Sequence, residues 1–222
     1  PPPPPPFFFF TQIPAYEIRL SLVGSEMCIR DRVFNMPQIP KEGHSSRVFR
    51  NTIVSNNTEN FAAAGTAVSG VPKGSGVLIN SNDRVEIFNN QFKDNQTANI
   101  LISSYFSANF AGQRELADEF DPYPEEIFIY DNDFRGGGTE PGRDYLVQLK
   151  NQVFGENGNF PDIIWDGMTN PVDQGRQVIC IQNADAQIFN LDLPNEFKDP
   201  RIDETLQSCE LSKLPEVRLS ES

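Results

Sequence analysis

The chain has 222 residues with a formal net charge of −13 at pH 7, one histidine and three cysteines. A surface this acidic repels nucleic acid and anionic membranes, and it argues against tight binding of a polyanionic sugar unless a cation or a local basic groove intervenes. A single histidine excludes His-rich metal sites, and no run of about 18 or more apolar residues is present to span a membrane as a helix.

The first 32 residues read as a non-native addition. They begin with two homopolymer blocks, PPPPPPFFFF, and end in AYEIRLSLVGSEMCIRDR, which looks like a translated sequencing adaptor and index primer. A signal peptide is the alternative, but no basic region precedes the apolar block, and Glu17 and Arg19 interrupt it. We therefore expect residues 1–32 not to fold. Residues 33–222 then form a partial domain that has lost its true N-terminus and ends in a capping region.

Three native segments superpose on a shared asparagine. They read RVFRNTI, VEIFNNQF and IFIYDNDF, and they centre on Asn51, Asn90 and Asn132. Each has an apolar residue three positions before the asparagine and another two positions after it, which predicts an inward-facing strand interrupted by a turn. An asparagine at a turn can adopt left-handed dihedral angles and hydrogen-bond its equivalent in the next repeat. The pattern therefore predicts an asparagine ladder.

The middle repeat predicts three short strands separated by polar turns. The strands fall in residues 76–79, 85–92 and 98–102, within about 27 residues, the size of one coil of a parallel β-helix. Because the asparagines recur at spacings of 39 and 42, each repeat is longer than a bare coil. We expect residues 59–74 and 103–126 to hold extra strand and protruding loops.

The C-terminal third departs from the strand pattern. Residues 144–155 place Leu146, Leu149 and Val153 at helical spacing, with Gly155 as a stop signal. This spacing predicts a short helix that packs over the strands.

These motifs together resemble a known family. The run GVLINSNDRVEIFNNQFKDNQTANILISSY, followed by IFIYDNDF and PDIIWDG and closed by ICIQNADAQIFNLDL, is similar to a bacterial family of parallel β-helix repeat-containing proteins. That family belongs to the pectin-lyase-like superfold, and the resemblance covers nearly all of residues 44–217. It implies an all-β fold, a right-handed parallel β-helix solenoid with protruding loops and a short helix in its C-terminal third. Its motifs are structural, so no catalytic residue carries over.

The cysteines bear on location. Cys28 lies in the adaptor-like segment, which leaves Cys180 and Cys209 either as a disulfide closing a C-terminal loop or as two buried thiols. The exported habit of most β-helix proteins favours the disulfide and a periplasmic or extracellular location.

Carboxylates near the third asparagine are candidates for catalysis. Asp131, Asp133 and Arg135 lie on one strand–turn unit, and alternation places both carboxylates on its outward side. Such a pair could hold Ca²⁺ or exchange protons in a lyase or epimerase, which needs a charge neutraliser, a base and an acid. The alternative, which we favour, is a solvated turn of an acidic protein.

Two aromatic residues are candidates for sugar binding. Trp165, the one tryptophan, could stack on a sugar ring, although a core or capping position explains it more simply. Tyr123 lies in the loop Asp-Pro-Tyr-Pro, which resembles an alginate-epimerase motif but lacks its histidine.

These residues predict an exported β-helix module that binds glycans or serves as a structural element of the cell surface. A polysaccharide lyase or C5-epimerase acting on uronates is the alternative, so the residues leave open whether the protein is an enzyme. We expect no cofactor unless Ca²⁺ serves such an enzyme, and no partner except a polysaccharide. The protein is expected to be a monomer.

Overall fold

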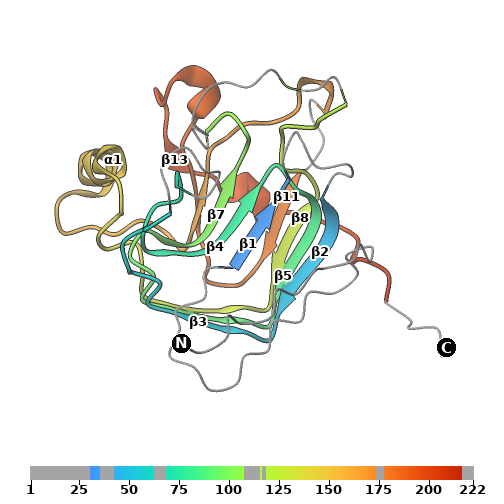
Figure 1. The fold of residues 1–222 in the computed structure, drawn as a ribbon, viewed down its shortest axis with the longest axis horizontal. Coiled ribbons are helices and arrows are strands. Elements are labelled where there is room, and N and C mark those ends of the chain that lie inside the picture. Colours follow the sequence, from blue (N-terminus) through green and yellow to red (C-terminus); the bar gives the residue numbers. More distant parts are fainter. Residues whose placement is uncertain are drawn as a thin grey trace, which may run out of the picture.

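A computed structural model describes residues 31–35, 43–62, 69–107, 116, 119–173 and 178–216. Within these residues the chain is mostly strand, with a single α-helix (Figure 1). Cys28 and the rest of the adaptor-like segment up to residue 30 lie outside the described residues, as do residues 217–222.

The strands form three sheets, and nearly all strand pairs in them are parallel. Sheet A has the order β1 (Asp31–Phe34), β4 (Ser75–Asn80), β7 (Ala98–Ser103), β10 (Ile163–Trp165), β12 (Ile188–Asn190) and β13 (Arg201–Ile202). Sheet B has the order β11 (Ile179–Gln182), β8 (Ile127–Tyr130), β5 (Asp83–Phe88) and β2 (His44–Phe49). Sheet C has the order β3 (Thr52–Val54), β6 (Gln91–Lys93) and β9 (Asp133–Arg135). The final pair, β12 with β13, is antiparallel.

The chain visits the three sheets in turn, and equivalent residues pair in register. The succession β4, β5, β6 passes through sheets A, B and C, and β7, β8, β9 repeats it. Alternating residues therefore form straight rows across each sheet. The row Val85, Ile127, Ile179 is fully buried in the main core. Because alternate residues of a pleated strand point to the same face, branched aliphatic side chains stack in rows across the sheet and pack closely.

Two expectations about the positions of elements can be compared with the described residues only in part. Strand β1 begins at Asp31, because main-chain pairing of Asp31 with Val77 and Arg32 with Leu78 does not depend on side-chain identity. The described parts of residues 59–74 and 103–126 hold turns and irregular chain after β7 ends. Residues 63–68, 108–115, 117 and 118, which belong to the same ranges, lie outside the described residues, so the extra strand stays a prediction.

The three predicted asparagines form a ladder at the corner between sheets B and C. The Asn51 Nδ2 atom donates to Asn90 Oδ1 over 3.1 Å, and Asn90 Nδ2 donates to Asn132 Oδ1 over 3.0 Å. The backbone N–H of each asparagine donates to the same Oδ1 atom as its side chain. Left-handed dihedral angles, however, belong to the preceding residues Arg50 and Asn89, with φ of 56° and 54°. The turn is made one residue early, which lets the asparagine amide point inward.

The ladder extends beyond the repeat found in the sequence. Asn132 N donates to Asn183 Oδ1 over 2.9 Å, which makes Asn183 a fourth member. A second corner carries the pair Asn56 and Asn95, in which Asn56 N donates to Asn95 Oδ1 and Asn95 Nδ2 donates to Ile53 O. Corner amides thus satisfy backbone groups that the strands leave unpaired.

The predicted helix packs on the outer face of sheet A. Helix α1 (Asp144–Phe154) ends at Gly155, whose φ is 79°. Leu146 is buried and Leu149 partly buried against sheet A, whereas Val153 is exposed, contrary to the helical-spacing prediction. Phe154 takes the contact instead, at 5.1 Å between ring centroids from Phe189.

The C-terminal segment crosses the outer face of sheet B and is covalently attached there. Cys180 of β11 and Cys209 form a disulfide with a sequence separation of 29. Further along, Leu214 N donates to Glu86 Oε1 over 2.8 Å, and the Lys213 ammonium lies 4.1 Å from the Tyr130 ring centroid. The segment therefore covers part of an aromatic surface on sheet B.

Candidate functional site

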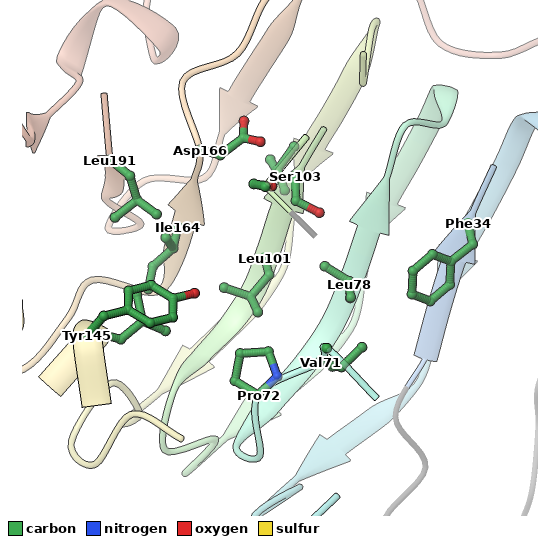
Figure 2. Close-up of a pocket in the computed structure, with 14 residues that line it drawn as sticks. Phe34, Val71, Pro72, Leu78, Leu101, Ser103, Tyr145, Ile164, Asp166 and Leu191 are labelled. Atoms are coloured by element: carbon green, nitrogen blue, oxygen red, sulfur yellow. The ribbon is translucent and has the colours of Figure 1, made fainter. Parts of the chain in front are cut away.

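An apolar groove runs across the outer face of sheet A beside α1. Its floor consists of one aliphatic residue from each of three neighbouring strands, Leu78, Leu101 and Ile164, and Tyr145 of α1 lies along its rim (Figure 2). The cavity volume is about 80 Å³. A space of this size falls well below the several hundred cubic ångströms of most ligand sites. We therefore assign it to imperfect packing of α1 on the sheet.

The polar end of this groove is occupied by a buried carboxylate. Asp166 accepts hydrogen bonds from Ser104 N and Ser104 Oγ over 2.6 and 2.7 Å and from Met168 N over 3.0 Å. Burial raises the pKa of Asp166, while these donors act in the opposite direction. The carboxylate thus fastens the chain after β10 to the chain after β7.

A hollow lies where an inward row of sheet A changes from apolar to polar. The row runs from Ile79 through Ile102 and Trp165 to Asn190, one residue per strand. Since Asn190 is shorter and polar, it does not continue the aliphatic core beyond the Trp165 indole. A hollow of about 600 Å³ remains there, which we call the Trp165 pocket.

Charged and hydroxyl groups of the C-terminal segment line the other side of the Trp165 pocket. They include Asp192, Arg201, Asp203 and Thr205. Asp203 Oδ1 accepts from Thr205 Oγ1 over 2.5 Å, and Asp203 Oδ2 accepts from Asn190 Nδ2 over 3.3 Å. Strand β13 brings these residues to the pocket by its antiparallel pairing with β12. The arrangement combines an aromatic wall with hydrogen-bonding groups of both kinds.

Trp165 itself is mostly enclosed. It is 5% exposed and belongs to the main core, the kind of position that explains it more simply than an open stacking platform. Its Nε1 atom is nevertheless buried without a hydrogen-bond partner among the described residues. An indole N–H left unpaired away from water costs free energy, and buried Trp nitrogens usually find an acceptor.

Gly167 gives the pocket its width. A Cβ atom at this position would lie 2.4 Å from Asn190 Oδ1, and the backbone φ is 86°. Only glycine meets both demands without displacing Asn190.

On the other side of the loop that follows β10, carboxylates gather. Asn170 Nδ2 donates to Asp121 Oδ2 over 3.5 Å, and Glu125 is hydrogen-bonded to Asp173. Burial, the bond to Asp173 and the charge of Asp121 raise the pKa of Glu125 to about 7. These contacts join the chain before β8 to the chain after β10. The group therefore holds a proton more readily than a free glutamic acid does.

Tyr123 stands beside this cluster. Its ring centroid lies 5.6 Å from that of Phe106, which is 47% exposed, and the rings are inclined by 52°. Tyr123 N donates to Asp121 Oδ1 over 2.9 Å. The pair forms a small aromatic surface next to the carboxylates.

The predicted carboxylate pair lies at a different place. Asp131 and Asp133 both line a hollow of about 290 Å³, together with Asp162 and Asp185. Arg135 does not line it, because its guanidinium binds Asp133 through Nη2 over 2.7 Å and Nε over 3.1 Å on the exposed end of β9. The structure brings the two aspartates together, and no basic side chain is found among the described residues that line this hollow.

Sequence reasoning missed most of the Trp165 pocket. Asn190, Arg201 and Asp203 carry no motif, and only the register of β10, β12 and β13 brings them to Trp165. The cluster around Glu125 gave a weak signal, an acidic run in a protruding loop.

No group of three or more His, Cys, Asp or Glu side chains in the described residues is arranged to hold a metal ion. Over the same part of the chain, no helix has the length and apolarity to cross a membrane. Comparisons with protein-family models, with curated proteins and with solved structures find no match to this chain.

Proposed function

We propose that the strands form successive coils of a right-handed parallel β-helix. The parallel pairing within sheets A, B and C, the repeated order in which the chain visits them, and the asparagine ladder at a constant corner all support this. Such a scaffold presents loops and end surfaces on a rigid frame, which suits binding to extended polymers.

We propose further that the protein is an exported glycan-binding module whose site is the Trp165 pocket. The observation that carries this is the hollow of about 600 Å³ that Trp165 lines together with carboxylates and hydroxyls. Sugar hydroxyls donate hydrogen bonds to the carboxylates, while ring C–H groups contact the apolar lining that Trp165, Val178 and Leu206 supply. The Cys180–Cys209 disulfide supports an oxidising location such as the periplasm or the cell exterior.

The test uses the single tryptophan as its reporter. Oligosaccharides titrated into the full chain are expected to shift the emission of Trp165 in a saturable way. In calorimetry, Asp203→Asn keeps the size of the side chain, removes the charge of an acceptor in the lining, and should weaken binding about tenfold or more. The matched control is Tyr145→Phe at the groove beside α1, which should bind like the wild type. Emission unchanged by every oligosaccharide would overturn the proposal.

A second candidate function, acid–base catalysis on uronates, rests on Glu125. A carboxyl with a pKa of about 7 beside a second carboxylate is suited to proton transfer at neutral pH. The hydrogen bond between Glu125 and Asp173 brings them closer than the spacing of about 5 Å or more used by glycosidase pairs, so a shared proton is the simpler description. Ultraviolet absorbance of unsaturated products from uronate polymers, with and without Ca²⁺, tests the lyase. Product formed by the wild type and not by Glu125→Gln would favour it over pure binding.

A further inference from the structure

We propose that the outer edge of β9 receives an extended segment of a partner polypeptide, in which lysine or arginine alternates with apolar residues. The segment adds a fourth strand to sheet C beside the hollow that Asp131 and Asp133 line. This hollow shares no lining residue with the Trp165 pocket, so the partner is independent of the glycan-binding proposal. It departs from the expectation that a polysaccharide is the only partner.

The outer edge of β9 has no strand beside it in the described part of the chain. After β9, the chain adds β10 to sheet A and β11 to sheet B, but sheet C ends at β9. The chain turns directly after β11, where Ala186 N donates to Asn183 O over 3.3 Å, and then enters β12 of sheet A. The place of a fourth strand in sheet C is therefore left to another segment.

The main chain of β9 offers hydrogen-bonding groups at this edge. Asp133 N donates to Asn90 O, and Arg135 O accepts from Asp94 N, so these two residues of β9 face the coil of β6. Main-chain groups alternate in direction along a strand, so the N–H and C=O of Phe134 face the outer edge. An added strand pairs with these two groups, as in other cases of β-augmentation.

The inward row of side chains in sheet C is also open at this edge. Ile53, Phe92 and Phe134 stand in register on β3, β6 and β9. The rings of Phe92 and Phe134 stack with their centroids 5.0 Å apart, but Phe92 is 1% exposed whereas Phe134 is only partly buried and lines the hollow. An apolar side chain on the added strand continues this row and covers the Phe134 ring.

The charges around the hollow indicate which strand fits. Four aspartates line it, and its described lining contains no basic side chain: Asp131, Asp133, Asp162 and Asp185. The side chains on either side of the apolar residue point to the other face of the added strand, next to the outward side chain of Asp133. Lysine or arginine there is attracted by the carboxylates, whereas glutamate or aspartate is repelled. Charge complementarity thus selects a basic strand.

The experiment measures the binding of three synthetic heptapeptides to the full chain by calorimetry. The first has the order Lys-Val-Lys-Phe-Lys-Val-Lys, and the second has glutamate at every lysine position. The third keeps the lysines but carries N-methyl groups on its three central residues, which prevents main-chain pairing. We expect the first peptide to bind, and the other two to bind at least about tenfold more weakly. Equal binding of the first and third would show attraction by charge alone and overturn strand addition. Equal binding of the first and second, or no binding of the first, would also overturn the proposal.

Two double variants separate the hollow from the general acidity of the chain. Asp131→Asn with Asp185→Asn removes two charges from the lining and should weaken binding of the first peptide about threefold or more. Asparagine tolerates the left-handed φ of 52° at position 131. The matched control, Glu156→Gln with Glu216→Gln, removes two exposed charges outside the lining and should change the affinity less than about twofold. Equal weakening in both double variants would contradict a site at the hollow.

Amide hydrogen exchange locates the bound peptide. Exchange of the Phe134 N–H should slow about tenfold or more in the complex, because the added strand pairs with it. The Asp133 N–H is the internal control, since it already donates to Asn90 O and should exchange at an unchanged rate. Binding of the first peptide without protection of Phe134 would overturn strand addition at β9.

Discussion

At the residue scale, the asparagine ladder shows how one side chain satisfies several backbone groups. Asn90 is buried, donates to Val48 O and Asn132 Oδ1, and accepts from Asn51 N and Asn51 Nδ2. Asn90→Ala leaves buried groups unpaired above and below it, and we expect a loss of about 2–4 kcal/mol in the free energy of unfolding. Urea denaturation measures it.

Position within the ladder supplies the matched comparison. Asn51 is the first described member and is only half-buried, so Asn51→Ala should cost about 1 kcal/mol. Gln91→Ala, at an exposed neighbour, should change stability by about 0.5 kcal/mol or less. Equal losses of unfolding free energy in Asn51→Ala and Asn90→Ala would contradict cooperation between neighbouring asparagines of the ladder.

Glu125 makes stability depend on pH. Its pKa is about 7 in the folded protein and near 4.5 in the unfolded chain, so the folded state binds the proton more tightly. This contribution is fully present below about pH 4.5 and is lost as the pH rises through about 7. In Glu125→Gln the side chain does not titrate, so this loss of stability with rising pH is absent. Since Glu125 is only partly buried, we expect the variant to gain about 1 kcal/mol, or about 2–4 °C in Tm, relative to the wild type between about pH 5 and pH 8. Parallel melting curves for the two proteins would contradict this.

Residue-level prediction from the sequence succeeds where the pattern is local. Asn51, Asn90 and Asn132 share flanking apolar residues, and the same pattern explains their contacts. Asn183 does not match the sequence repeat, because ICIQN has one residue fewer before its asparagine than IFIYDN. The sequence pattern predicts the left-handed residue one position too late, because asparagine tolerates that conformation. In the structure the preceding residue adopts it, and the asparagine side chain hydrogen-bonds inward.

At the scale of elements, helix α1 depends on a buried lysine. Lys150 Nζ donates to Glu156 O over 3.0 Å and to Gly158 O over 2.8 Å, which ties the chain after the helix back onto it. Lys150→Met keeps the aliphatic length but leaves both carbonyls without this donor. We expect faster hydrogen exchange across α1, corresponding to about 1–3 kcal/mol of local stability, with little change in the sheets. Gln148→Met, on the exposed face, is the control and should leave exchange unaltered.

Elements were easier to predict than their partners. The short apolar runs predicted β4, β5 and β7, and helical spacing with a glycine stop predicted α1 to within a residue. The Trp165 pocket could not be predicted, because it depends on which strands pair and in what register. Asn190 follows Trp165 in an inward row only after β12 has paired with β10. No local pattern encodes that pairing.

At the scale of the whole molecule, the disulfide links the last strand of sheet B to the segment that covers that sheet. Its loop spans 29 residues and includes β12, β13 and much of the Trp165 pocket. Removing the cross-link by Cys180→Ala with Cys209→Ala enlarges the unfolded ensemble, which should cost about 3–4 kcal/mol. Denaturation with and without a reducing dithiol measures the same quantity in the wild type, and the double variant should be insensitive to the dithiol.

Which part of the molecule loses stability on reduction shows whether the disulfide stabilises only the C-terminal segment or the whole fold. Cys209 belongs to a segment that also binds Glu86 and Tyr130 through Leu214 and Lys213, so non-covalent contacts should keep it near sheet B after reduction. We therefore expect the reduced protein to retain its parallel sheets and to lose resistance first to proteases that cleave near Lys213. Trp165 emission should change little before global unfolding, because Asn190 and Asp203 remain bonded to each other without the disulfide. An early change in that emission on reduction would show instead that the cross-link maintains the pocket.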